Sequence, residues 1–312
     1  MLRLRFTADD LLRVRYATGP APLLELGMAL ATLQRHDAVF ARWARRTRLP
    51  RTAFPLFELI PPSATGPLFV DPVSEGFEDG LDMVLSTPHD HARAELVRTC
   101  RPTSLPRRLA DRDRDAWRTL EHALRDAYGA VIGQDEPRIR ASYDADLAWR
   151  RVVTAEQGIG AALAGLYPGS HWEGTDLVVD VPEDSEHAPR GRGLTLMPSV
   201  FWTGRPLIGT HTDGSMLLVY PALTPVPLVD TEPPDALAAL LGRTRAAVLS
   251  MLVEYRTTSE LALTLGISVA SASTHAKTLR GAGLVATRRA GKAVRHVATP
   301  LGLRLLRRGL TS

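Results

Sequence analysis

The fold of the C-terminal part of this chain is decided by residues 257–285, which read TTSELALTLGISVASASTHAKTLRGAGLV. Thr257 and Glu260 have the spacing of a capping box, in which each side chain binds the backbone N–H of the other at the start of a helix. Gly266 suits the left-handed conformation that ends a helix and turns the chain sharply. Ser268 suits the N-cap of a second helix. The pattern therefore predicts a helix-turn-helix.

The second of these helices, predicted over 268–280, has two different faces. Ala272, His275, Ala276 and Leu279 recur at helical spacing and form a stripe for packing. The opposite face is polar, short and weakly charged, which suits the floor of a DNA major groove. An exposed structural helix more often carries Glu/Lys pairs. The DNA contacts predicted on this helix, with His275 equally suited to packing, are Ser268, Val269, Ala270, Ser271, Ser273, Thr274, His275, Lys277 and Thr278.

A basic β-hairpin, or wing, is predicted directly after this helix. Segments 284–287 and 293–298 read as its strands, with Ala290-Gly291 as the turn between them. Positive charge at the tip can neutralise phosphates or enter the minor groove. The predicted wing contacts are Arg288, Arg289, Lys292 and Arg295. A final leucine-rich helix is predicted after Thr299-Pro300.

Three parts are predicted along the chain. Segment 221–234 holds five prolines in 14 residues and reads as a linker. It separates a 1–220 regulatory or dimerisation domain from a 235–312 winged helix-turn-helix, in which 235–241 and 244–254 form the first two helices.

Charge is distributed unevenly between these parts. Residues 243–312 contain twelve Lys and Arg against two Glu, a net charge of +10. The remaining 1–242 contain 26 basic and 32 acidic residues, a net charge of −6. An acidic body with a basic end favours a polyanionic partner for that end.

The run GISVASASTHAKTLRGAGLV and the wing RRAGKAVRHVATPLG resemble the winged helix of the arsenic-repressor (ArsR/SmtB) family, in its long actinobacterial form with an N-terminal extension. The matching residues are Gly266, Ser268, His275, Ala276, Lys277, Leu279 and Ala282-Gly283-Leu284. The resemblance implies a homodimer that binds an inverted repeat in double-stranded DNA. It does not extend to metal sensing, because 260–263 lack the family's Cys-x-Cys motif and the last helix carries no metal ligand.

The N-terminal region is predicted to be mostly helical with one or two β-hairpins, which makes the whole chain α+β. Helices are predicted over 23–37, 106–132 and 147–166. Alternating apolar residues predict strands at 177–181 and 194–201, joined by 183–192 as a long hairpin loop. A second hairpin is predicted from 207–209 and 216–220, through 211–214.

Three other patterns invite a chemical role. His89-Asp90-His91 lacks a third ligand and favours a solvated loop, and His171-Trp172-Glu173 favours a turn that follows a helix. Arg98 and Arg101 could lower the pKa of Cys100, although a single cysteine without a partner is more often incidental. No G-x-S-x-G, P-loop, H-E-x-x-H or dinucleotide motif is present. The sequence therefore predicts no catalytic site, no cofactor and no metal.

We therefore expect a cytoplasmic, sequence-specific transcriptional regulator without a membrane span. Its N-terminal domain would hold a small-molecule effector or a dimer surface. A pocket lined by aromatics would favour the effector, and a solid core would favour dimerisation. Two alternatives stay open. One is an enzyme with an accessory winged helix, which needs a catalytic constellation in 1–220. The other is a winged helix that binds protein.

Overall fold

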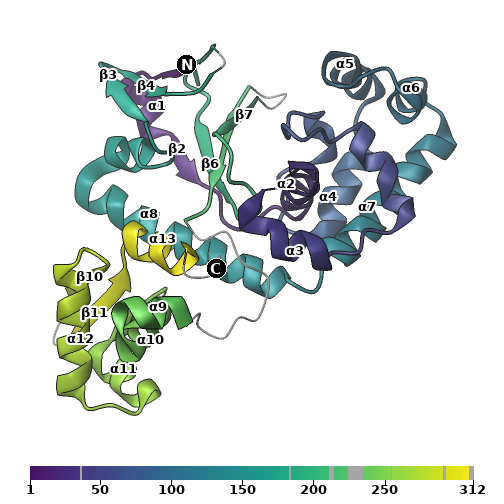
Figure 1. The fold of residues 1–312 in the computed structure, drawn as a ribbon. Coiled ribbons are helices and arrows are strands. Elements are labelled where there is room, and N and C mark those ends of the chain that lie inside the picture. Colours follow the sequence, from purple (N-terminus) through teal and green to yellow (C-terminus); the bar gives the residue numbers. More distant parts are fainter. Residues whose placement is uncertain are drawn as a thin grey trace. The chain divides into compact units, whose positions relative to one another are not determined.

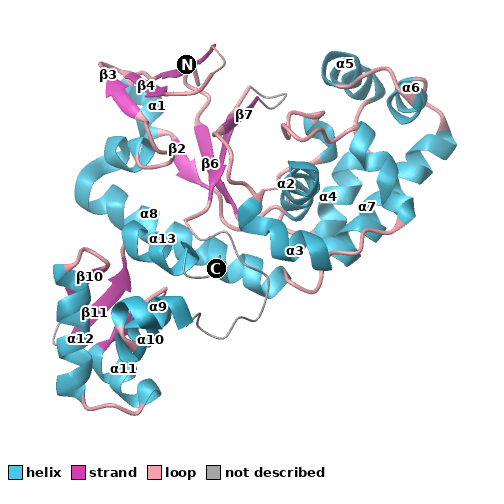
Figure 2. Cartoon of the chain, viewed as in Figure 1, coloured by secondary structure: helices cyan, strands magenta, loops and turns pink. Residues whose placement is uncertain are grey.

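The computed structural model describes residues 1–35, 37–182, 184–210, 214–223, 235–253, 255–290 and 293–308 (Figures 1 and 2). These residues form helices and sheets of the predicted α+β class, which is confirmed. The chain divides into two compact units, unit 1 (Met1–Leu228) and unit 2 (Val229–Ser312). The division lies within 224–234, outside the described residues.

Unit 1 contains helices and two four-stranded sheets. Its helices, with 3-10 helices marked η, are α1 (Ala8–Leu12), α2 (Pro22–Arg35), η1 (Ala38–Phe40), α3 (Ala41–Arg46), η2 (Arg51–Glu58), η3 (Leu68–Val70), α4 (Phe77–Leu85), α5 (His89–Thr99), α6 (Ser104–Ala110), α7 (Arg114–Val131) and α8 (Glu136–Ala164). Its strands are β1 (Leu2–Arg5), β2 (Val14–Tyr16), β3 (His171–Glu173), β4 (Asp176–Val179), β5 (Ser185–His187), β6 (Leu194–Ser199), β7 (Leu207–Thr210) and β8 (Met216–Pro221). The first sheet has the order β3-β4-β1-β5 and the second β2-β6-β8-β7.

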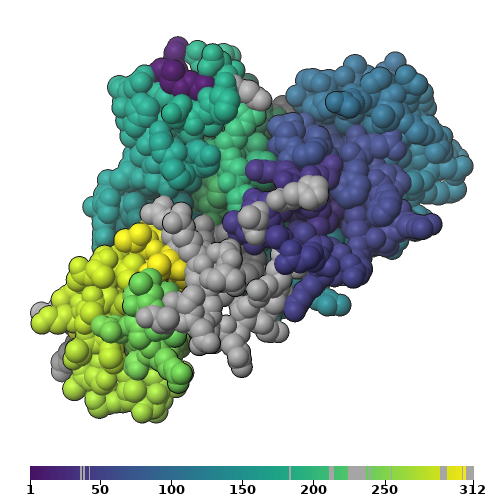
Figure 3. Space-filling model, viewed as in Figure 1, coloured from purple at the N-terminus to yellow at the C-terminus, as the bar shows by residue number. Residues whose placement is uncertain are grey.

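The second sheet separates two hydrophobic cores. Leu217 and Val219 of β8 belong to the core formed with helices such as α2, α4 and α7, which lie together on one side of the sheet (Figure 1). Met216, Leu218 and Tyr220 belong to the other core, shared with the first sheet and the end of α8. Because both faces are buried, β8 is apolar along its whole length. In the space-filling view, green atoms of this sheet lie between the teal and blue parts (Figure 3).

A buried carboxyl group of α2 fixes the end of β6. Glu25 Oε2 accepts a hydrogen bond from Ser199 Oγ at 3.0 Å, and its Oε1 accepts one from the Val200 N–H at 3.2 Å. Glu25 is 1% exposed. The contact therefore ties the helical core to the strand that both cores share.

A second buried carboxyl group, from α8, fixes the end of β8. Asp146 accepts hydrogen bonds from the Tyr220 hydroxyl and from the Leu223 N–H, each at 2.8 Å. β8 itself continues through Pro221. The sequence predicts that the linker begins at residue 221. Unit 1 extends past that point, because Pro221 pairs within the sheet and Leu223 is hydrogen-bonded to α8.

One predicted hairpin is wrong and the other is confirmed. Segment 183–192 does not join paired strands, because β4 pairs with β1 in the first sheet and β6 pairs with β2 and β8 in the second. Two of these partners, β1 and β2, come from the first 16 residues of the chain, and local alternation does not indicate such distant pairing. β7 and β8 do form the second hairpin, although 211–213 lie outside the described residues.

The predicted helices exist with changed limits. The 106–132 helix is broken at 111–113, where Arg112 has a φ of 61° and Asp113 caps α7 by accepting two backbone N–H groups. The 23–37 helix ends at Arg35. The 147–166 helix is the second part of α8, which kinks at Gly158 (φ 85°).

Unit 2 has the element order of the predicted winged helix-turn-helix. Its elements are α9 (Asp235–Leu241), α10 (Arg243–Met251), β9 (Arg256–Thr257), α11 (Thr258–Leu265), α12 (Val269–Gly281), β10 (Val285–Ala290), β11 (Ala293–Ala298) and α13 (Pro300–Arg308). The strands form one sheet of order β10-β11-β9. Among the described residues of the chain, no helix is both long and apolar enough to cross a membrane.

Burial of Glu25 makes the stability of unit 1 depend on pH. Desolvation raises the pKa of this carboxyl from 4.5 to about 7 in the folded protein. The folded state therefore holds the proton more tightly, so stability is lost as pH rises from 4.5 through about 7, by about 3 kcal/mol. Glu25→Gln keeps an oxygen acceptor and does not titrate. The free energy of unfolding of the variant, relative to wild type, should rise by that amount between pH 4.5 and pH 8.

Urea unfolding followed by tryptophan fluorescence measures this effect in unit 1, because all five tryptophans lie there. Glu75→Gln, at an exposed position, is the matched control and should show no such rise. A difference between Glu25→Gln and wild type that is the same at both pH values would contradict the prediction.

Candidate functional site

The turn between α11 and α12 depends on Gly266. Its φ of 64° and ψ of 31° are left-handed, as predicted, and its N–H donates to the Ala262 and Leu263 carbonyls. The Ile267 N–H donates to the Ala262 carbonyl at 3.0 Å and closes the turn. A side chain at position 266 would strain the backbone, because only glycine adopts this conformation without cost.

Side-chain caps start both helices of the motif, as the sequence predicted. Thr257 and Glu260 form the reciprocal capping box at α11. The Ser268 hydroxyl accepts from the Ser271 N–H at 3.1 Å and caps α12. These contacts satisfy backbone donors that a helix start otherwise leaves without partners. The two helices thus begin at residues fixed by local chemistry.

Small side chains seat α12 against its neighbours. Ala272, Ala276 and Leu279 are buried, and Ala262 of α11 is buried too. Their size lets the helices cross closely. His275 differs from the rest of its predicted stripe, because it is half-buried and its Nε2 lies 3.2 Å from the Ser271 hydroxyl.

The opposite face of α12 is open to solvent. Among the predicted DNA contacts on this helix and its cap, Ser271 and His275 are half-buried. The exposed ones are Ser268, Val269, Ala270, Ser273, Thr274, Lys277 and Thr278. The sequence analysis missed Arg280, which is exposed and lies about two turns beyond Ser273 on the same stripe. Its seven-residue spacing from Ser273 was the available signal.

Hydroxyl groups on this face differ in what they can offer a ligand. Thr274 donates to the Ala270 carbonyl and Thr278 to the Thr274 carbonyl, each at 3.0 Å. Among the described residues, the Ser273 hydroxyl has no hydrogen-bond partner. Ser273 can therefore both donate and accept, while the two threonines present an acceptor and a methyl group.

The first wing strand is longer than predicted, and the second, β11, has the predicted bounds 293–298. β10 continues to Ala290, which pairs with Ala293, so Ala290 belongs to the strand and not to the predicted Ala290-Gly291 turn. Gly291 and Lys292 lie outside the described residues, as does the side chain of Arg289. Strand pairing therefore extends closer to the tip than the sequence indicated.

Two exposed arginines stand opposite each other across the wing. Arg288 pairs with Arg295 in the β10-β11 register. Like charges at opposed positions destabilise a hairpin by about 0.2–1 kcal/mol. Glu260 offsets part of this, since Arg295 is among the groups that lower the pKa of its carboxyl, after its hydrogen bonds to Thr257.

A buried histidine joins the wing to the helix-turn-helix. His296 of β11 is 6% exposed, with Nε2 3.0 Å from the Thr258 hydroxyl and Nδ1 2.9 Å from the Thr287 hydroxyl. Burial, and then the charge of Arg280, lowers the pKa of His296. The ring is therefore a neutral link among α11, β10 and β11. No sequence pattern marked it.

The last helix is anchored beside the wing. Thr299 donates its N–H to the Leu284 carbonyl at 2.9 Å and accepts from the Gly302 N–H at 3.2 Å, which caps α13. A Cβ at Gly302 would lie 2.2 Å from the Leu284 carbonyl oxygen. Glycine thus permits the close approach of α13. The side chains of Arg304, Arg307 and Arg308, and residues 309–312, lie outside the description.

The histidine pair and the cysteine in unit 1 differ from their predicted settings. His89-Asp90-His91 forms the first turn of α5, not the predicted solvated loop, and His89 Nε2 lies 2.9 Å from the Ala110 carbonyl. Cys100 is half-buried, and desolvation raises its pKa, so the predicted lowering is wrong. The nearby charge of Glu95 raises the pKa of Cys100 further. Among the described residues, no three His, Cys, Asp or Glu side chains are placed to hold a metal.

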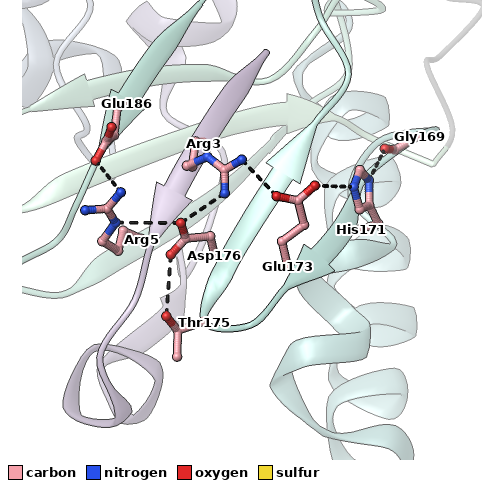
Figure 4. Close-up of polar contacts among 8 residues, drawn as sticks. All are labelled: Arg3, Arg5, Gly169, His171, Glu173, Thr175, Asp176 and Glu186. Carbon is pink, nitrogen blue, oxygen red and sulfur yellow. Dashed lines mark hydrogen bonds and ion pairs between the residues drawn. The ribbon is translucent and has the colours of Figure 1, made fainter.

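A charged network lies across the first sheet (Figure 4). His171 and Glu173 belong to β3, not to the predicted turn, because this segment pairs with β4. Arg3 bridges Glu173 at 2.8 Å and Asp176 at 3.1 Å. Its hydrogen bond holds the pKa of Glu173 below the usual range. Carboxylates that stay ionised beside arginine are suited to a structural network rather than to proton transfer.

Comparisons with known protein families, with curated proteins and with solved structures find no match to this chain. Its function is therefore inferred from the residues and the geometry described above.

The left-handed turn leads to a prediction on unit 2. A Cβ at Gly266 would meet no atom within 4 Å, so Gly266→Ala tests backbone conformation alone. We expect it to lower the stability of α11 and α12 by about 1 kcal/mol. Amide hydrogen exchange of peptides from 257–281, measured by mass spectrometry on the full chain, reports the loss.

Gly281→Ala provides the matched control. Gly281 ends α12, and a Cβ there also meets no atom within 4 Å. Alanine in a helical conformation should leave exchange unchanged or slow it. Equal acceleration by both substitutions would show that Gly266 has no special role.

Proposed function

We propose that this chain is a sequence-specific transcriptional regulator of the arsenic-repressor type, in which α12 binds the major groove of DNA. In this proposal the β10-β11 wing binds the backbone or the minor groove. The observation that carries the proposal is the combination, in one unit, of an exposed, weakly charged polar helix face with a basic hairpin.

The chemistry of α12 suits base recognition. A major groove admits a helix and offers donors, acceptors and thymine methyl groups. Ser273 can use its hydroxyl in both directions, and the methyl groups of Thr274 and Thr278 can contact thymine. Lys277 and Arg280 add cations on the exposed face. A helix that merely faces solvent needs no such set.

The wing suits phosphate binding. Arg288 and Arg295 are exposed and lie opposite each other across the wing, so that one phosphate could contact both guanidinium groups. The +10 charge of 243–312 supports the same partner. A polyanionic partner thus matches both the two wing arginines and the positive net charge of the whole segment.

We further propose that the regulator is a homodimer on an inverted repeat, with half-sites roughly 34–36 Å apart. The support for a homodimer is the resemblance of residues 266–302 to the arsenic-repressor winged helix, which implies this mode of binding. Unit 1 would then hold the effector. We propose no enzymatic activity, because the clusters described in unit 1 form structural contacts.

DNA titrations can separate the two elements. Arg288→Ala with Arg295→Ala should weaken binding to all duplexes and reduce the slope of log K against log salt by about 2. The measurement is fluorescence anisotropy with a labelled site selected from random duplexes, compared with its shuffled sequence. Arg101→Ala with Arg107→Ala, exposed in unit 1, removes the same charge and should leave the slope unchanged.

The recognition helix should respond differently. Ser273→Ala should lower the preference for the selected site over the shuffled one about tenfold, with the salt slope retained. Ser259→Ala, an exposed serine of α11, is the control and should preserve the preference. Binding without salt dependence and without sequence preference would refute the proposed function. Equal effects of the wing and helix variants would refute the placement of α12.

A further inference from the structure

Unit 1 contains a cavity of about 400 Å³ at the edge of its second sheet. α2, the segment 64–71, the end of α5 and strands β7 and β8 surround it, and His187 of β5 completes the lining. Small-molecule sites have volumes of roughly 300–1,000 Å³. The cavity is therefore large enough for a ligand of about ten to twenty non-hydrogen atoms.

Specific contacts hold the cavity wall in place. Glu95 of α5 is 6% exposed, and its Oε2 accepts from the Phe69 N–H at 3.0 Å, which fixes η3. On the other side, a Cβ at Gly209 would lie 3.2 Å from Leu68 Cδ2, so glycine lets η3 approach β7 closely. The wall thus belongs to the folded structure rather than to a loose loop.

Half of the 16 residues that line the cavity are apolar. Leu24 and Met28 of α2 face it together with Leu217 and Val219 of β8. Its described lining contains no Phe, Tyr or Trp, unlike the aromatic pocket that the sequence analysis considered. Such a wall binds the apolar body of a ligand by shape and burial rather than by ring stacking.

Asp71 adds a carboxyl group to this half-apolar lining. It lines the cavity, and its Oδ1 is shielded from solvent with no hydrogen-bond partner among the described residues. Desolvation, and then the charge of Glu95, raises the pKa of Asp71 to about 7. No other described residue donates to either carboxyl oxygen of Asp71, which costs free energy, and a ligand N–H group on the cavity side of this carboxyl would supply a donor.

The neighbouring charges favour a cationic donor. From α5, Glu95 adds negative charge, and Arg98 Nη2 lies 3.7 Å from its Oε1, so the arginine is already engaged. From β5, His187 has its pKa lowered by burial and is neutral. His91 Nε2 also lies 3.6 Å from Glu95 Oε1, so Arg98 is, among the described residues, the one permanent cation beside the two carboxyl groups, a balance that a monocation completes and an anion worsens.

We propose that this cavity binds a small, mainly apolar molecule carrying one protonated amine, whose N–H groups bind the Asp71 carboxylate. Such amines would be the effectors of the regulator. Only this effector role rests on the proposed function, and the binding itself does not. β8 lines the cavity with Leu217 and Val219 and continues to Leu223, which Asp146 holds directly before 224–234. A ligand therefore contacts the strand that leads to unit 2.

Calorimetry of the full chain with three matched probes tests this proposal. The probes are 4-phenylbutylamine, 4-phenylbutanol and 4-phenylbutyrate, which share one apolar body and differ in the polar end. At pH 8 the amine should bind with a Kd of about 1 mM or tighter, at least about tenfold tighter than the others. Tighter binding of 4-phenylbutyrate, or equal binding of all three, would overturn the proposal.

Variants then assign the amine to the cavity. Asp71→Asn should weaken amine binding about tenfold or more, while Asp82→Asn, at an exposed position of α4, should not. Wild-type affinity for the amine should rise from pH 6 to pH 8 as Asp71 ionises, and that rise should vanish in Asp71→Asn. Amine binding that Asp71→Asn leaves unchanged would refute the site.

Two features keep this test decisive. Asp71→Asn removes a charge that the fold disfavours, so tryptophan fluorescence during urea unfolding at pH 8 should show a variant at least as stable as wild type. The calorimetry contains no DNA. Failure of the amine to bind would therefore refute the cavity proposal alone, and failure to bind DNA would refute the proposed function alone.

Discussion

Burial of the second sheet on both of its faces is the constraint on which unit 1 depends. β6 and β8 are parallel neighbours, and their alternate side chains enter two different cores. Backbone at the ends of such strands needs partners that water cannot supply. Glu25 and Asp146 provide them from α2 and α8. The same two carboxyl groups therefore decide how both helices lie against the sheet, and the cavity beside β7 and β8 follows from that arrangement.

Unit 2 depends on small residues where its helices meet. The left-handed Gly266 turns the chain between α11 and α12, and buried alanines let the helices approach. His296 then links the wing to the start of α11 through two threonine hydroxyls. Because packing occupies one face of α12 completely, the other face is free to carry short polar side chains. The proposed DNA surface is thus a consequence of how the packing face is built.

The two units divide the proposed tasks by charge as well as by fold. The basic residues of 243–312 suit a polyanion, whereas unit 1 contains 26 basic and 29 acidic residues and has no excess of positive charge. Within unit 1, a carboxyl group in a cavity with a half-apolar lining favours a small cation instead. β8 belongs both to that cavity and to the segment before the linker. A regulator of this design would couple ligand and DNA through one strand and its anchor at Asp146.

The sequence by itself determined the features that neighbouring residues encode. The Thr257 and Glu260 capping box, the Gly266 turn and the β7-β8 hairpin each depend on groups close together in the chain, so their patterns were visible. Tertiary structure alone decided the pairing of β1 with β4 and of β2 with β6, and it alone brought Asp71 to a cavity wall. These contacts join segments far apart in sequence, where no periodicity or spacing records which partner burial will select.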